Sequence, residues 1–148
     1  MICQKIYDLI LELNYSKKSY NIVEAILRIL DIDLNLYPTE EIKNNVQIFR
    51  RKMGNELITK NIYKTLDYSL KIEKNEINSI LINNKYIDEN TTKYISYYIN
   101  LNIIIINNNK YRYINKYNSN LGSIILIEKD KKFIPVYFVD NNNIINVF

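Results

Sequence analysis

The stretch Tyr94 to Asn107, YISYYINLNIIIIN, decides the fold that this sequence predicts. Its first half places apolar and aromatic side chains at helical spacing, and its second half contains four consecutive isoleucines, Ile103 to Ile106. β-branched residues favour extended backbone, and a short unbroken apolar run is typical of a strand covered on both faces. We therefore expect a helix that leads directly into a central strand, with other layers packed above and below it.

The residues before Tyr94 predict a series of helices. Apolar side chains recur at helical spacing in residues 3–14, 20–32, 38–57, 60–71 and 74–84, and Asp88 or Asn90 begins the helix before the isoleucines. Asn21 and Glu24 have the spacing of a capping box at the start of one helix. That helix is apolar on nearly all sides, so we expect it to be the buried central helix.

The residues after Asn107 predict short strands. Segments 111–114, 123–128, 133–139 and 143–147 are rich in β-branched and aromatic residues and are separated by polar turns. Because the connections are short, we expect antiparallel pairing, and Pro135 places its strand at an edge or a bulge. The predicted fold is a single α+β domain over residues 1–148. About five to six helices in residues 1–101 pack on a mainly antiparallel sheet of about five strands in residues 102–148.

The composition bounds the class of protein. Ile, Asn, Lys and Tyr, all with codons rich in A and T, make up more than half of the 148 residues. We interpret this bias as evidence of an AT-rich genome, and we expect a large DNA virus as the source. The net charge of +4 is mild, and no stretch approaches the ~18 apolar residues of a membrane span. One cysteine, Cys3, excludes an intramolecular disulfide and fits a reducing compartment.

Residues that usually carry catalysis are scarce. The sequence contains no histidine, two glycines and one cysteine near its N-terminal end. Without imidazole, Cys–His and Ser–His nucleophile pairs cannot form, nor can zinc sites that use histidine. Two glycines do not make a phosphate-binding loop. We therefore expect no catalytic residue, no metal and no cofactor. A hydrolase that uses only carboxylates is disfavoured, because helix ends account for the acidic pairs.

Two sets of side chains are candidates for contact with a partner. Tyrosine buries area and keeps a polar tip, so it is enriched at interfaces. The candidate protein contacts are Tyr94, Tyr97, Tyr98, Tyr111 and Tyr113. The candidate nucleic-acid contacts are Arg50, Arg51, Lys52, Lys110 and Arg112. Residues 110–113 alternate basic and aromatic side chains, as a stacking platform does, although half-buried tyrosines on one side of a sheet are the simpler interpretation.

The order of elements is similar to that of a known family. The buried helix starts with SYNIVEA (19–25), a helix-to-strand segment spans Thr91 to Ile106, and a late strand reads KKFIPV (131–136). Over residues 19–139 this pattern resembles papain-like cysteine proteases of the ovarian-tumour (OTU) deubiquitinase type. In that family a cysteine stands at the first turn of the helix and a histidine opens the strand. Ile22 and Phe133 occupy the corresponding places, so the resemblance implies an inactive relative in which these two side chains lie together.

The function expected from the sequence is a non-catalytic structural or protein–protein interaction protein. A minor capsid or other virion component, located in the host cytoplasm or the virion, fits this expectation. Its partners would be other virion proteins or a second copy of the chain. The first alternative, implied by the resemblance, is a catalytically dead OTU-like protein that binds ubiquitin or a host protein. The second alternative is a weak nucleic-acid-binding protein. We expect no membrane contact.

Overall fold

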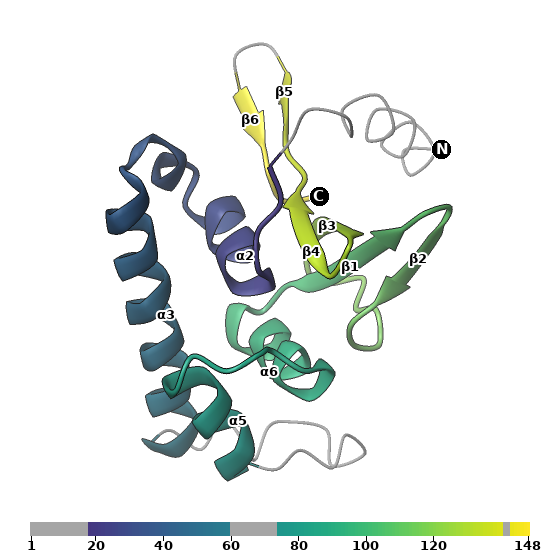
Figure 1. Ribbon diagram of the computed structural model, residues 1–148. Coiled ribbons are helices and arrows are strands. Elements are labelled where there is room, and N and C mark those ends of the chain that lie inside the picture. Colours follow the sequence, from purple (N-terminus) through teal and green to yellow (C-terminus); the bar gives the residue numbers. More distant parts are fainter. Residues whose placement is uncertain (1–17, 60–73, 141–142) are drawn as a thin grey trace.

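The computed structural model describes residues 18–59, 74–140 and 143–148 (Figure 1). The helices are α2 (Ile22–Leu30), the 3-10 helix η1 (Ile32–Leu36), α3 (Thr39–Thr59), α5 (Lys74–Ile82) and α6 (Glu89–Ile99). The strands are β1 (Asn102–Asn107), β2 (Lys110–Tyr113), β3 (Ser123–Lys129), β4 (Lys132–Pro135), β5 (Phe138–Asp140) and β6 (Asn143–Ile145). The helices predicted at 3–14 and 60–71 lie outside the described residues, as does Cys3.

Side-chain caps begin two of the helices. The Asn21 side chain accepts a hydrogen bond of 2.9 Å from the Glu24 N–H at the start of α2. The Asp88 side chain accepts one of 2.8 Å from the Thr91 N–H at the start of α6. Each cap satisfies an amide that helix geometry leaves without a partner. The predicted starts of both helices are therefore confirmed.

The predicted passage from helix to strand is also confirmed. α6 ends immediately before Asn100, whose φ of 57° is left-handed and stops the helix. Side chains of β1 then alternate between the two faces of the sheet. Ile103 and Ile105 join the main core with the helices, whereas Ile104 and Ile106 belong to a second apolar cluster. The strand thus has apolar clusters on both faces, as the unbroken isoleucine run predicts.

The sheet confirms the expectation of mainly antiparallel pairing in part. Its four strands have the order β2-β1-β3-β4, and β5 and β6 form a separate antiparallel hairpin. The outer pairs of the four-stranded sheet are antiparallel, but β1 and β3 are parallel, with Asn102 opposite Ser123 and Ile106 opposite Ile127. Within the described residues the architecture is therefore a mixed four-stranded sheet plus a separate hairpin, and not one sheet of about five strands.

The parallel pairing follows from the path of residues 114–122. After β2 the chain returns to the end of the sheet where β1 begins, so β3 runs in the same direction as β1 (Figure 1). The Asn102 side chain holds this return segment. Its Nδ2 donates to the carbonyl oxygens of Asn118 (2.9 Å) and Leu121 (3.1 Å), and its Oδ1 accepts from the Asn118 N–H (2.9 Å). A strand and a loop thus supply the crossover that parallel strands require.

The strand predicted at 133–139 is divided in two. β4 ends at Pro135 and β5 begins at Phe138, where the chain leaves the four-stranded sheet to form the hairpin. Proline has no N–H to donate to a neighbouring strand, and β4 is an edge strand, as Pro135 predicted. The described residues contain four α-helices and one 3-10 helix, so the predicted helix count is confirmed only in part.

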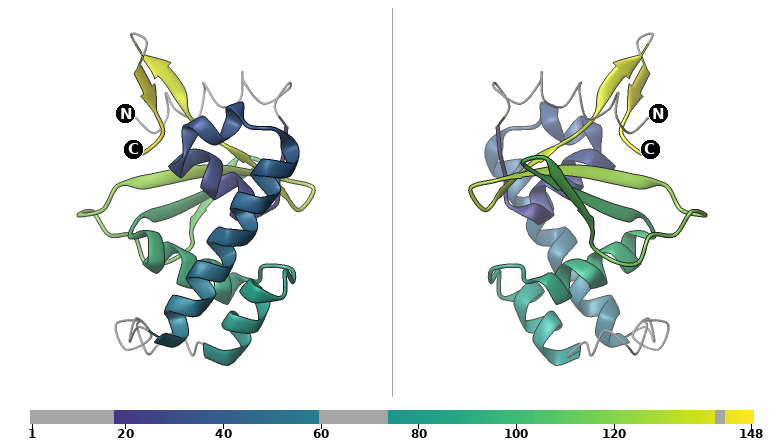
Figure 2. Two further views of the ribbon diagram at one scale, coloured as in Figure 1. Left: turned by 90° about the vertical axis from the view of Figure 1, so that its left-hand side faces the viewer. Right: turned by 90° about the vertical axis from the view of Figure 1, so that its right-hand side faces the viewer.

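Helices cover one face of the sheet (Figures 1 and 2). α2 packs against β3 and β4, α3 packs against α2, and α5 packs against both α3 and α6. Side chains of these helices form one buried cluster with Ile103, Ile105, Ile124 and Leu126 of the sheet. This packing brings the first turns of α2 and α6 against the same face of the strands.

Candidate functional site

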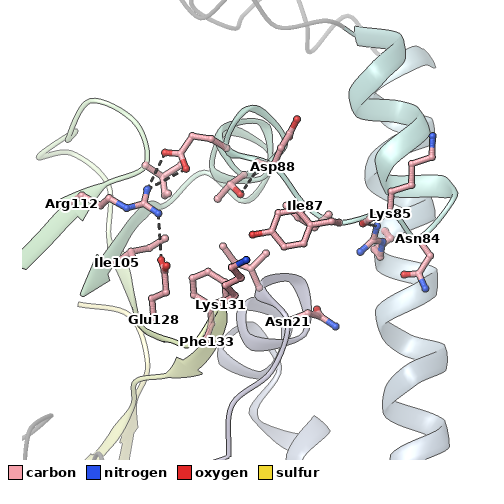
Figure 3. Close-up of a pocket in the computed structure, with 16 residues that line it drawn as sticks. Asn21, Asn84, Lys85, Ile87, Asp88, Ile105, Arg112, Glu128, Lys131 and Phe133 are labelled. Carbon is pink, nitrogen blue, oxygen red and sulfur yellow. Dashed lines mark hydrogen bonds and ion pairs between the residues drawn. The ribbon is translucent and has the colours of Figure 1, made fainter. Parts of the chain in front are cut away.

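A pocket of about 350 Å³ lies where the first turns of α2 and α6 meet the sheet (Figure 3). The connection between α5 and α6, the strands β1 to β4 and the turn between β3 and β4 also line it, together with Arg50 of α3 and Ile114 just after β2. Its apolar lining is Ile22, Ile87, Ile105, Ile114 and Phe133. Its charged lining is Arg50, Lys85, Asp88, Glu89, Arg112, Glu128 and Lys131. The pocket therefore combines an aliphatic and aromatic wall with charges of both signs.

Ile22 and Phe133, the two positions identified by the resemblance, both line this pocket. An antiparallel bridge joins the backbone of Phe133 to that of Tyr20, two residues before Ile22. In this bridge each N–H donates to the carbonyl oxygen of the other residue at 2.8 Å. Since Tyr20 directly precedes the cap Asn21, the bridge holds the start of α2 against β4. Both side chains at the two positions are apolar, so they supply neither a nucleophile nor a base.

Arg112 forms one side of the pocket as a bridge between two acids. Its Nη1 lies 2.9 Å from Glu89 Oε1, and its Nη2 lies 3.5 Å from Glu128 Oε2. Cross-strand partners share a face of a sheet, so Arg112 lies on the same face as its partner Ile105 (Figure 3). The bridge connects α6, β2 and β3. This cation, which we expected to contact nucleic acid, is already engaged by two carboxylates.

Arg50 is buried, with only 3% of its surface exposed. Its guanidinium donates to the carbonyl oxygens of Ile80 (2.7 Å), Leu81 (3.1 Å) and Lys85 (2.8 Å) at and just beyond the C-terminal end of α5. The end of a helix leaves such carbonyls without partners, so Arg50 acts as their cap. Burial lowers the pKa of the Arg50 guanidinium. The prediction that Arg50 contacts nucleic acid is wrong, because the side chain is buried and its Nε and Nη2 donate to carbonyl oxygens inside the protein.

The other basic candidates lie apart from one another. Arg51 and Lys52 are exposed on α3, and Lys110 is exposed on β2. In Figure 1, α3 and β2 lie at opposite sides of the fold. The expected set of nucleic-acid contacts therefore does not form one surface.

The tyrosines of α6 differ in exposure. Tyr94 is fully buried, and its hydroxyl donates to the Met53 carbonyl oxygen at 2.7 Å. Tyr98 is half-buried, and its ring centroid lies 6.1 Å from that of Tyr94. Burial raises the pKa of both phenols, that of Tyr98 to about 12, and a hydrogen bond and the charge of Glu56 add to the shift at Tyr98. The prediction of Tyr94 as a partner contact is wrong, because it packs into the core against α3, whereas Tyr97 is exposed.

The tyrosines of β2 are more exposed than the simpler interpretation predicted. Tyr111 and Tyr113 are 68% and 40% exposed, and their ring centroids lie 5.7 Å apart. Tyr117, in the loop after β2, places a third ring 5.0 Å from Tyr113. We call Tyr111, Tyr113 and Tyr117 the tyrosine patch. Tyr111 and Tyr113 pair with Ile106 and Ile104 of β1, so these two tyrosines lie on the face of the sheet opposite to the pocket.

Several pocket residues were not predicted from the sequence. Tyr86 is 77% exposed and, with Lys85, lines the pocket from the connection between α5 and α6. Lys131 lines it from the turn between β3 and β4, with a left-handed φ of 63°. The one usable signal was a tyrosine within a polar turn, NNKY (83–86). The remaining lining residues belong to separate segments that only the folded chain brings together.

In the part of the chain that the structure describes, no group of three or more His, Cys, Asp or Glu side chains is placed to hold a metal ion. None of the described helices has the length and apolar character needed to cross a membrane. Comparisons of the chain with protein-family models, with curated proteins and with solved structures gave no match.

Proposed function

We propose that this protein is a non-catalytic binding protein whose pocket receives a segment of a protein partner. The observation that supports this most is that Ile22 and Phe133 line one pocket, while the Tyr20–Phe133 bridge holds the residue that precedes the α2 cap against β4. This is the arrangement that the resemblance to OTU-type proteases implies for the cysteine and histidine positions. At these places Ile22 is almost fully buried and Phe133 is half-buried, and neither side chain supplies a reactive group.

The lining of the pocket suits a protein segment. The half-buried ring of Phe133 and the exposed ring of Tyr86 supply area for association, and surrounding charges fix the orientation of the bound segment. A volume of about 350 Å³ is enough for one or two side chains. Tyr86 and Lys131 are exposed and line the pocket, so a partner can reach them without rearrangement of the core. Tyrosine is also enriched among the residues that dominate binding energy.

Ubiquitin is the first partner to test, because the resemblance implies an inactive OTU-like protein that binds ubiquitin without cleaving it. The experiment measures binding of monoubiquitin and of ubiquitin chains to the purified full chain, and it also monitors chain length over time. We expect saturable binding and no shortening of the chains. Absence of binding at every concentration would remove ubiquitin as the partner. Cleavage that a single substitution abolishes would overturn the non-catalytic assignment.

A substitution of Tyr86 tests whether the pocket is the binding site. Because the Tyr86 side chain is largely exposed, Tyr86→Ala should leave the fold intact. We expect it to weaken partner binding. Tyr37→Ala is the matched control, since Tyr37 is an exposed tyrosine at the end of η1 and outside the pocket lining. Equal affinities for both variants and the unaltered chain would place the partner elsewhere on the molecule.

A virion role, expected from the composition, is a second version of the same proposal, with other virion proteins as the partners. Proteomic analysis of purified particles tests the virion role, and light scattering tests self-association. We expect the protein in particles or in assemblies. A strict monomer that is absent from particles would contradict this version.

A further inference from the structure

The tyrosine patch presents three neighbouring rings to solvent. Tyr111 is 68% exposed, Tyr117 47% and Tyr113 40%. The ring of Tyr113 lies between the other two, with centroid distances of 5.7 Å to Tyr111 and 5.0 Å to Tyr117. Single exposed apolar residues are ordinary on protein surfaces, but contiguous exposed aromatic area marks a contact site. The exposure of adjacent rings is therefore a feature that the fold itself does not explain.

The patch lies on a segment that carries only positive charge. Between Glu89 and Glu128 the sequence has no Asp or Glu, and its four charged residues are Lys93, Lys110, Arg112 and Lys116. Lys110 and Lys116 are exposed, and each is the chain neighbour of a patch tyrosine. Arg112 is held by Glu89 and Glu128 on the other face of the sheet. The two lysines beside the rings favour an anionic partner.

Strand β2 is also accessible along its length. It is the end strand of the four-stranded sheet, and all four of its residues are exposed. Exposed strand residues that combine aromatic rings with cations are the means by which many proteins hold unpaired bases. A base stacks on a ring regardless of its identity, and a lysine neutralises the adjoining phosphate.

We propose that the tyrosine patch, with Lys110 and Lys116, binds single-stranded nucleic acid by base stacking without sequence preference. Carboxylates of an acidic protein would satisfy the lysines, but they would leave the ring faces uncovered. An unpaired strand supplies both an anion and a π face at each nucleotide. The strand tyrosines lie on the face of the sheet opposite to the protein-binding pocket, so this activity is separate from the proposed function.

Fluorescence anisotropy of a labelled oligothymidylate of about ten nucleotides tests the stacking contacts. Tyr111→Ala and Tyr117→Ala should each weaken binding about fivefold or more, because a stacked base is lost. Tyr37→Ala is the matched control, since Tyr37 is 41% exposed and lies on a different element. A duplex of the same length should bind less tightly, because its bases are already stacked and paired.

A salt titration tests the phosphate contacts. For single strands the logarithm of the binding constant falls with the logarithm of salt concentration by about 0.7 for each neutralised phosphate. Lys116→Gln should reduce this slope by about 0.7, because one contact is lost. Lys52→Gln, a change of an exposed lysine on α3, should leave the slope unchanged.

Two results would overturn the proposal. One is the absence of oligonucleotide binding at low salt, or binding that Tyr111→Ala and Tyr117→Ala leave unchanged. The other is displacement of the oligonucleotide by polyglutamate at equal charge concentration, which would assign the surface to acidic protein segments. Neither result contradicts the proposed binding of a protein partner in the pocket. That binding should weaken in Tyr86→Ala and should be unchanged in Tyr111→Ala and Tyr117→Ala.

Discussion

Tyr20 and Phe133 exchange two backbone hydrogen bonds, each 2.8 Å long, that hold the start of α2 against the edge strand β4. Because the bonds join backbone atoms, they do not depend on which side chain stands at position 133 or at the nearby position 22. The same backbone frame can therefore present a reactive pair or two apolar residues. For this reason, the inactive OTU-like protein that we propose requires no change of fold.

The cap at the start of α2 should contribute measurable stability. Asn21→Ala removes the acceptor for the Glu24 N–H, and loss of such a cap costs about 1 kcal/mol of unfolding free energy. Asn44→Ala, an exposed change within α3, should be neutral or slightly stabilising, because alanine is the better helix former. Urea unfolding of both variants measures the difference. Equal stabilities of the two variants would show that the cap contributes nothing.

The buried Arg50 should be among the most sensitive positions of α3. Arg50→Met leaves the carbonyls of Ile80, Leu81 and Lys85 without their donor, and we expect a loss of about 2–4 kcal/mol. Arg51→Met changes the exposed neighbour and should alter stability by less than about 0.5 kcal/mol. Urea unfolding compares them. A similar small effect at both positions would falsify the capping role of Arg50.

The bridge made by Arg112 should contribute little to stability and depend on salt. Its side chain and that of Glu89 are about half exposed, and exposed ion pairs contribute at most about 1 kcal/mol. Arg112→Gln should therefore lower the unfolding free energy slightly at low salt, and the difference should vanish near 1 M salt, where screening is nearly complete. Thermal unfolding at the two ionic strengths checks this. A loss that persists at high salt would assign the effect to packing.

Tyr98 should make the protein sensitive to alkali. Its pKa is raised to about 12 in the folded state, first by burial and then by Glu56, whereas the unfolded value is about 10. Between these values the folded state binds more protons than the unfolded state, so stability falls as pH rises from about 10 to about 12. Tyr98→Phe should reduce this fall, whereas Tyr37→Phe, at an exposed ring, should not. Urea midpoints at pH 9 and pH 11 provide the measurement, and an equal fall in all three proteins would contradict the assignment to Tyr98.

Local structure could be predicted because its causes lie a few residues apart. The Asn21 and Asp88 caps act over three residues. The unbroken isoleucine run of β1 predicts by itself that both faces of the strand are covered. The edge position of the strand with Pro135 follows from a missing N–H. These features depend on backbone geometry and on the period of apolar residues, both of which are visible without partners.

The direction of β3 and the burial of individual polar side chains could not be predicted in the same way. β3 is parallel to β1 because Asn102 holds a return loop through Asn118 and Leu121, and no local pattern marks those contacts. No local pattern separates Tyr94 from the tyrosines of the patch, yet Tyr94 packs into the core, where its hydroxyl donates to the Met53 carbonyl oxygen. The run Arg50, Arg51 and Lys52 likewise resembles a solvated basic face in the sequence. Only the tertiary structure shows that Arg50 donates to carbonyl oxygens at and beyond the end of α5.

The sequence alone determined the chemical inventory: no imidazole, one thiol near an end, and helices followed by strands. The tertiary structure decided which members of that inventory face solvent, which face the pocket, and which are used in the core. The physical reason is that burial and hydrogen bonding depend on partners far away in the chain. A side chain becomes a contact or a core residue only when those partners have been placed.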